Sequence, residues 1–217
     1  ASVQHPGHRG LADSQWTQWR KMTELYRWCR GRGVYLWVPD WYFLNGSSKV
    51  FLGYREENWT LPRDEQVILG RQNIFDGTWQ KTPSMGWTFL PLVSYKGGGA
   101  AATIEPLCEH LDTYAAHLAQ NFGSGIQCSY RGSRLFDTEA TKTVVKKWVD
   151  FYKQYRPILD SDIIHVRRPD ARGLDCMMHV NPRLKERALA MVYNPAAGRF
   201  EGSLRLPLHL PGLTETA

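Results

Sequence analysis

The sequence predicts an α/β fold in which a parallel sheet is followed by an antiparallel β module. Across residues 34–157, short apolar stretches alternate with helical patterns, an order typical of parallel β/α units with right-handed crossovers. After residue 157 the helical patterns stop, and short strands follow one another between turn-forming residues, which indicates an antiparallel sheet. We therefore expect a (β/α) region at 1–158 and an antiparallel β module at 159–217.

The elements of the first region are predicted from hydrophobic spacing and from residues that begin or end helices. A helix over 16–30 has Asp13 or Ser14 as its cap and ends at Gly31 or Gly33. Proline and acidic residues suit a first helical turn, which places further helix starts at Pro62, at Glu105–Pro106 and after Asp137 or Thr138. We expect these three helices to end by Gly77, at Gly123 and before Pro157. Strands are predicted at 34–38, 50–54, 87–93 and 125–130.

The second region contains four predicted strands and no predicted helix. The sequences DIIHVRR, LDCMMHV, RALAMVY and SLRLPL (162–168, 174–180, 187–193 and 203–208) have strand character, and turn sequences at 169–173, 181–182 and 194–195 separate them.

The first region has about half the length of a closed barrel. A (β/α)8 barrel takes about 250 residues, whereas residues 34–157 supply about four β/α units. The sheet is therefore either open or the second half of a barrel. In both cases the strands at 34–38 and 125–130 are edges, and exposed edges tend to be paired or covered. This predicts a homo-oligomer or pairing with a missing N-terminal half.

Composition excludes several classes of protein. The chain has 217 residues and a net charge of +6, but no run of Lys or Arg is longer than a pair, so we expect no nucleic-acid partner. Four cysteines without a CxxC pair indicate buried thiols, and His5 and His8 lack a third ligand, so neither a metal nor another cofactor is expected. No apolar run reaches 18 residues, which predicts a soluble protein without a membrane span; the sequence does not determine whether it is cytoplasmic or secreted.

Several blocks of the sequence resemble α-galactosidase-like bacterial glycoside hydrolases, large proteins in which a TIM barrel precedes an antiparallel β-sandwich. The resemblance is carried by VPDWYFLNGS (38–47), GYREENWTLPR (53–63), RQNIFDGTWQKTPSMGW (71–87), GGGAAATIEPL (97–107), residues 146–172, and HVNP with AMVYNP (179–182 and 190–195). It implies that residues 1–158 are a half barrel of catalytic type with barrel strands five to eight, and that residues 159–217 are an incomplete antiparallel β-sandwich. It also implies that the nucleophilic Asp of that clan, on strand four, precedes this chain, and that the acid/base follows on strand six.

Two carboxyl groups are the candidate catalytic residues. Glycoside hydrolysis uses a pair of carboxyl groups, and barrel enzymes carry their active residues at the C-terminal ends of strands. Asp40 follows the first predicted strand and Glu56 follows the second, so we expect both to face one cleft. The alternatives are that Asp40 caps a loop and that Glu56 belongs to a salt bridge with a neighbouring residue.

Aromatic and polar residues near the same strand ends are the candidate sugar contacts. Nine Trp and ten Tyr make the chain rich in aromatic residues, which line ligand clefts as well as cores. Asp76 precedes a glycine and is better interpreted as a turn acid, whereas Arg131 is equally well interpreted as part of a surface ion pair. The candidate substrate-binding residues are Trp41, Tyr42, Arg55, Asn58, Trp59, Asp76, Trp79 and Arg131.

The sequence therefore predicts a galactosidase-like glycoside hydrolase (an O-glycosyl hydrolase) that acts on carbohydrate by carboxylate acid/base catalysis. The alternative is a non-catalytic carbohydrate-binding remnant, or a module that depends on a partner chain. A third possibility is an esterase-type hydrolase, since KGGGAAA (96–102) resembles an esterase oxyanion loop, although the chain has no G-x-S-x-G sequence.

Overall fold

The computed structural model describes scattered positions between 17 and 34, together with residues 54–56, 61–80, 87–93, 99–196 and 198–213. The described positions from 17 to 31 are helical, in agreement with the predicted first helix, whereas the strand predicted at 34–38 lies almost wholly outside the described residues. The elements that follow are β1 (Tyr54–Glu56), α2 (Arg63–Gln80), β2 (Trp87–Pro91), α3 (Leu111–Gly123), β3 (Gln127–Arg131), α4 (Glu139–Leu159), β4 (Asp162–Arg167), β5 (Asp175–Val180) and β6 (Ala188–Tyr193).

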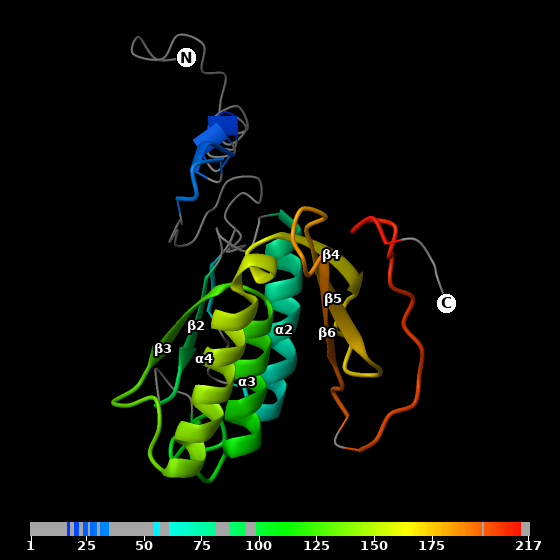
Figure 1. Ribbon diagram of the computed structural model, residues 1–217. Coiled ribbons are helices and arrows are strands. Elements are labelled where there is room, and N and C mark those ends of the chain that lie inside the picture. Colours follow the sequence, from blue (N-terminus) through cyan, green and yellow to red (C-terminus); the bar gives the residue numbers. More distant parts are fainter. Residues whose placement is uncertain are drawn as a thin grey trace, which may run out of the picture.

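The described strands form two sheets, and the helices lie between them (Figure 1). One sheet is parallel with the order β1-β2-β3, and the other is antiparallel with the order β4-β5-β6. The predicted α/β class, with a parallel sheet before an antiparallel one, is confirmed.

Two apolar clusters join these layers. The first lies between β2 and α3 and includes Leu90, Leu92, Tyr114 and Leu118, with Trp148 of α4 packed against it. The second joins α2 to the antiparallel sheet through Ile74, Phe75 and Met177. The helices therefore bury apolar side chains against both sheets.

Two helices extend further than predicted. α2 continues through Gly77 to Gln80 because tertiary contacts offset the cost of a helical glycine, about 1 kcal/mol. Thr78 is buried, and its hydroxyl contacts His165 of β4 at 3.0 Å. α4 begins after the predicted Thr138 cap but contains Pro157 and ends at Leu159, because the two residues after the proline are buried in the core.

α3 begins later than predicted, at Leu111. Residues 106–110 form turns instead, in which the backbone N–H of Glu109 donates to the carbonyl of Pro106 at 3.1 Å. One residue of this turn segment, Cys108, is exposed, so the prediction that the thiols are buried is wrong there. Cys29 and Cys176 are buried, and Cys128 is half-buried.

The antiparallel sheet contains three of the four predicted strands. β5 is buried at every position, because it is the central strand. The strand predicted at 203–208 is wrong, since this segment has no regular structure. Pro207 has no N–H to contribute to a ladder, and the N–H of Leu208 donates locally to the carbonyl of Leu206 at 3.0 Å.

Candidate functional site at the strand-exit edge

The parallel strands bring three chain positions to one edge of the sheet. β1 ends at Glu56, β2 at Pro91 and β3 at Arg131, and all three strands point the same way (Figure 1). We call this edge the strand-exit edge. In β/α proteins it is the edge where ligands bind, because the loops that leave the strands meet there.

The register places the predicted acid and the predicted arginine on the same face of this sheet. Glu56 is in register with Phe89, which pairs with Ser129, and Arg131 pairs with Pro91 two rows further along. The row between them pairs Leu90 with Tyr130, and both pack in the α3 cluster. Since successive rows alternate between faces, the Ser129 and Arg131 rows lie on the face away from α3, and Glu56 is in register with the first of these rows.

A second acid, Glu105, reaches this edge although the sequence only indicated a helix start there. Its backbone N–H donates to the carbonyl of Leu92 at 2.8 Å, and the N–H of Leu92 donates to the carbonyl of Arg131 at 2.7 Å. The hydroxyl of Ser133 donates to Oε1 of Glu105 at 3.4 Å. These contacts link the ends of β2 and β3 to Glu105, which is 13 positions from Leu92 and 28 from Ser133 in the sequence, so no local pattern could have revealed them.

Two adjoining surface depressions lie at the start of α2, with volumes of about 590 and 750 Å³, and Glu105 lines the smaller of them. Both are lined by Arg63, Glu109 and His110. Arg63 donates to the carbonyls of Ala100 and Thr103 at 2.5 and 2.7 Å, which ties the loop before Glu105 to the start of α2. Charged side chains line these depressions together with small apolar residues such as Ala101.

Two of the predicted contact residues lie elsewhere. α2 runs antiparallel to the strands, so Asp76 and Trp79 in its last turns lie near the opposite edge of the sheet. The prediction that Asp76 sits in a turn is wrong, because α2 continues past Gly77. Both oxygens of Asp76 accept hydrogen bonds from Arg168, at 3.0 and 2.9 Å, and this interaction raises the pKa of the Arg168 guanidinium.

Two of the remaining candidates, Arg131 and Arg55, belong to described strands, and the other five do not. Arg131 is an exposed residue at the end of β3. Arg55 is in register with Thr88 and Cys128, one row before Glu56. Asp40, Trp41, Tyr42, Asn58 and Trp59 lie outside the described residues and stay predictions.

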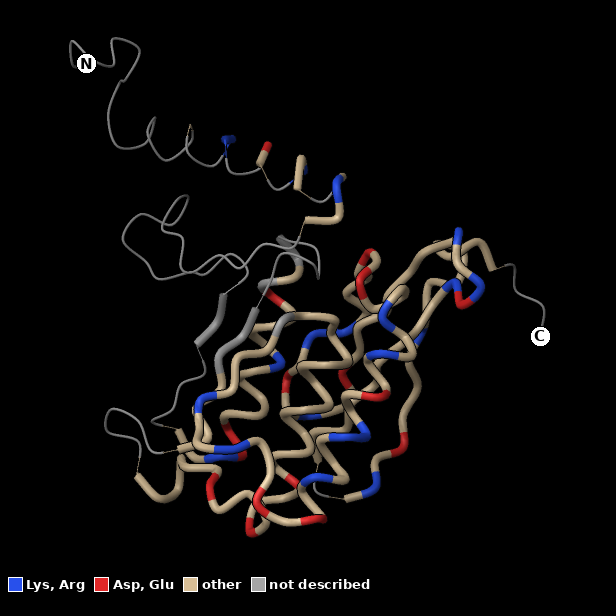
Figure 2. The backbone as a smooth tube through the Cα atoms, turned by 60° about the vertical axis from the view of Figure 1, so that its left-hand side comes forward, with Lys and Arg blue, Asp and Glu red and all other residues tan. Residues whose placement is uncertain are grey.

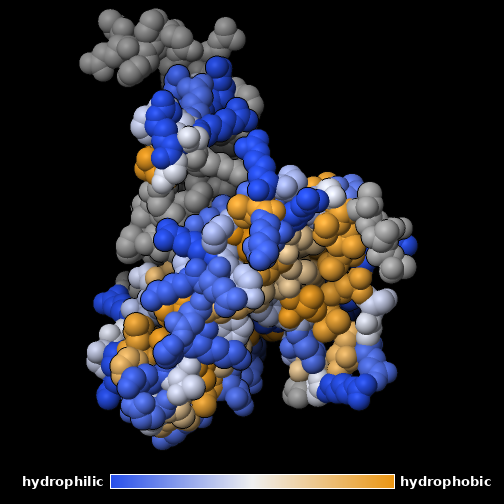
Figure 3. Space-filling model, in the orientation of Figure 1, coloured by the Kyte–Doolittle hydropathy of each residue, from blue (hydrophilic) through white to orange (hydrophobic). Residues whose placement is uncertain are grey.

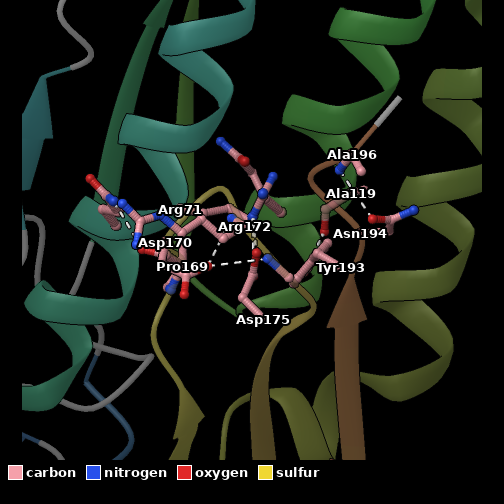
Figure 4. Close-up of polar contacts among 12 residues, drawn as sticks. Arg71, Ala119, Pro169, Asp170, Arg172, Asp175, Tyr193, Asn194 and Ala196 are labelled. Carbon is pink, nitrogen blue, oxygen red and sulfur yellow. Dashed lines mark hydrogen bonds and ion pairs between the residues drawn. The ribbon is translucent and has the colours of Figure 1, made fainter. Parts of the chain in front are cut away.

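A second polar cluster lies between α2 and the antiparallel sheet (Figure 4), and its residues Arg71 and Asp175 are buried. Nε of Arg71 lies 3.1 Å from both carboxylate oxygens of Asp175, and the side chains are 7% and 3% exposed. The guanidinium carbon lies 5.3 Å from the ring centroid of Tyr193, whose hydroxyl donates to the carbonyl of Ala119 at 3.2 Å. Burial raises the pKa of Asp175 to about 6, although Arg71 acts in the opposite direction.

Other buried ionisable groups around the helices stay neutral at pH 7. Burial lowers the pKa of His117 to about 3 and that of His179 to about 4. The Nε2 atom of His179 donates to the carbonyl of Gly123 at 3.0 Å. These groups, like Arg71 and Asp175, are buried where the helices meet the sheets.

Comparisons of the chain with protein-family models, with curated proteins and with solved structures found no match. Within the described residues, no group of three or more His, Cys, Asp or Glu side chains is arranged to hold a metal ion. None of the helices in the described part of the chain combines the length and apolar content needed to cross a membrane. Lys and Arg are interspersed with Asp and Glu over the described chain (Figure 2).

Proposed function

We propose that the protein is a glycoside hydrolase whose active site lies at the strand-exit edge of the parallel sheet. The observation that carries the proposal is the placement of Glu56 and Arg131 at the C-terminal ends of β1 and β3, in rows of the same sheet face. Barrel enzymes place catalytic groups at such strand ends. The resemblance of the sequence to α-galactosidase-like hydrolases supports the same assignment.

In this proposal β1–β3 and their helices belong to the second half of a (β/α)8 barrel. The face that carries the Glu56 row then lies toward the barrel interior, while α3 packs on the outer face through Leu90 and Leu92. The first half comes from a second copy of the chain or from an N-terminal portion of the protein. The antiparallel sheet packs on the outside of the helices, as a β-sandwich module appended to the barrel.

The proposed chemistry uses Asp40 and Glu56 as the carboxyl pair. One protonates the leaving-group oxygen, and the other attacks the sugar or activates a water molecule. A general acid needs a raised pKa, which burial provides and a nearby guanidinium opposes. Arg131 and Glu105 bind sugar hydroxyl groups, since a guanidinium only donates hydrogen bonds and a carboxylate only accepts them.

The test is hydrolysis of a panel of p-nitrophenyl glycosides and oligosaccharides by the full chain and its variants. Glu56→Gln and Asp40→Asn should each lower kcat/KM about 10²- to 10⁴-fold, the usual contribution of a positioned acid or base. Each should also remove one limb of a bell-shaped pH profile. Arg131→Met should raise KM more than it lowers kcat, because it removes a binding contact.

Glu186→Gln is the matched control, because Glu186 is exposed in the turn between β5 and β6, remote from the strand-exit edge. It makes the same chemical change and should leave hydrolysis unaltered. Hydrolysis that persists in both Asp40→Asn and Glu56→Gln would exclude the paired-carboxylate mechanism. Sugar binding without any hydrolysis would favour a carbohydrate-binding remnant.

A further inference from the structure

The loop between β3 and α4, residues 132–138, is held by hydrogen bonds along its length. The hydroxyl of Tyr114, a fully buried residue of α3, donates to the carbonyl of Leu135 at 2.9 Å. Asp137 accepts hydrogen bonds from the hydroxyl of Thr141 at 3.0 Å and from the backbone N–H of Cys108 at 3.1 Å. Thr138 then caps α4 in a capping box. The conformation of this loop is therefore fixed by the surrounding structure.

The same loop nevertheless presents two large apolar side chains to solvent. Leu135 is 45% exposed and Phe136 is 46% exposed. The ammonium group of Lys142 lies 5.9 Å from the centroid of the Phe136 ring, and Glu139 holds that ammonium at 3.0 Å. An exposed aromatic ring on a fixed loop, with a charged donor beside it, offers a ligand both an apolar face and a hydrogen-bond partner.

The loop also contacts the acid at the strand-exit edge. Ser133 donates to Glu105, and a Cβ atom at Gly132 would lie 3.0 Å from Leu92 Cβ and 3.4 Å from Glu105 Oε1. The close approach of the backbone at Gly132 thus brings the loop against the carboxylate. Ser133 and Phe136 are three residues apart, at most roughly 10 Å along an extended chain. One short loop therefore borders Glu105 at one end and exposes an aromatic ring at the other.

We propose that Leu135 and Phe136 form a platform on which a sugar ring of an oligosaccharide stacks. This ring lies beyond the position at which the pair of carboxyl groups cleaves the glycosidic bond. This platform rests on the proposed function, because it assumes a carbohydrate at the strand-exit edge. The C–H face of a pyranose packs on the ring, and its hydroxyl groups reach the Lys142 ammonium and the Glu105 carboxylate. Phe136 thereby selects oligosaccharides over single sugars.

The exposed apolar residues elsewhere differ from this platform in their surroundings. Val192, Phe200, Leu210 and Leu213 are between 37% and 47% exposed and belong to β6 and the C-terminal segment, where apolar residues gather over one part of the surface (Figure 3). β6 and this segment lie across the helices from the parallel sheet (Figure 1), so Phe200 provides a matched control for Phe136.

The experiment measures binding separately from hydrolysis. In a Glu56→Gln background, calorimetric titration with melibiose, raffinose, maltotriose and cellotriose gives Kd without turnover. Phe136→Ala should weaken binding of the preferred oligosaccharide roughly three- to tenfold, which corresponds to a ring-stacking energy of about 0.5–1.5 kcal/mol. Phe136→Trp should restore binding, and Phe200→Ala should leave Kd unchanged. In the active protein, Phe136→Ala should raise KM for the oligosaccharide without changing kcat.

The platform and the proposed function fail in different ways. An unchanged Kd in Phe136→Ala, with hydrolysis intact, overturns the platform and leaves the hydrolase assignment in place. Binding that depends on Phe136 in a protein that hydrolyses no glycoside overturns the hydrolase assignment and supports the platform. The platform is also overturned if no sugar binds at millimolar concentration, or if Phe136→Ala changes only the molar mass by light scattering, which would make these residues a protein interface.

Discussion

Replacing Arg71 by methionine should destabilise the protein strongly, and by an amount that depends on pH. The pair formed by Arg71 and Asp175 joins α2 to β5, and both side chains are almost fully buried. Methionine preserves most of the side-chain volume but leaves the carboxylate of Asp175 buried without its partner. Removing one member of a buried ion pair costs about 3–5 kcal/mol of unfolding free energy.

The sign of the pH dependence follows from Asp175. Its pKa is raised from 3.8 to about 6 in the folded protein, so the folded state binds a proton more tightly than the unfolded state. Stability from this group is therefore fully present below pH 4 and is lost as the pH rises through 6, by about 3 kcal/mol in total. Arg71 opposes this loss, and in Arg71→Met the pKa rises further. The variant should lose more stability at pH 8 than at pH 5, where Asp175 is protonated.

Urea unfolding followed by circular dichroism at 222 nm, at pH 5 and pH 8, measures these differences. Arg168→Met is the matched control, because the pair of Arg168 and Asp76 also involves α2 but is about half exposed and should contribute about 0–1 kcal/mol. The double variant Arg71→Met with Asp175→Leu should recover most of the loss, since no charge stays buried.

Two results would refute this reasoning. A loss in Arg71→Met no larger than that in Arg168→Met at pH 8 would show that burial of the pair is not decisive. Equal losses at pH 5 and pH 8 would show that Asp175 does not titrate between these values. The neighbouring Asp170 raises the Asp175 pKa and Arg167 lowers it, so both must stay unchanged in every variant.

Two further predictions concern backbone and packing. Thr138→Ala removes the capping box of α4 and should lower the unfolding free energy by about 1 kcal/mol. Thr138→Ser keeps the hydroxyl group and should retain most of the stability. An unchanged urea midpoint for the alanine variant would contradict this prediction. Gly123→Ala would place a methyl group against the side chain of Met191 and 2.7 Å from the hydroxyl of Tyr193, so we expect a loss of about 1–3 kcal/mol from overpacking, measured in the same way. If Gly123→Ala left the unfolding free energy unchanged, the side chains of Met191 and Tyr193 would have moved aside at no cost.

The strongest local signals predicted the elements well. Thr138 caps α4 as expected, and the three strands β4, β5 and β6 fall within a residue or two of their predicted positions. The alternation of strand and helix also led to the parallel sheet, because a right-handed crossover allows few other arrangements. In each case the information lies in neighbouring residues, through hydrogen-bonding side chains and the two periods of helix and strand.

Tertiary contacts decided where the elements end and which predicted strand does not form. α2 passes Gly77 and α4 passes Pro157 because the residues beyond them are buried, whereas residues 203–208 are strand-like in composition but have no strand beside them. Local preferences are worth about 1 kcal/mol, and burial of one large side chain exceeds that. The end of an element therefore depends on what lies next to it in space.

By itself the sequence determined the α/β class, the order of the elements and the positions of Glu56 and Arg131 at strand ends. Only the tertiary structure brought Glu105 to the same edge, put Asp76 and Trp79 near the opposite one, and closed Arg71 and Asp175 between α2 and the antiparallel sheet. Glu105 is tied to Leu92 and Ser133, and Arg71 to a residue 104 positions away. Such contacts join residues that share no periodicity, because they form only when separate elements pack together.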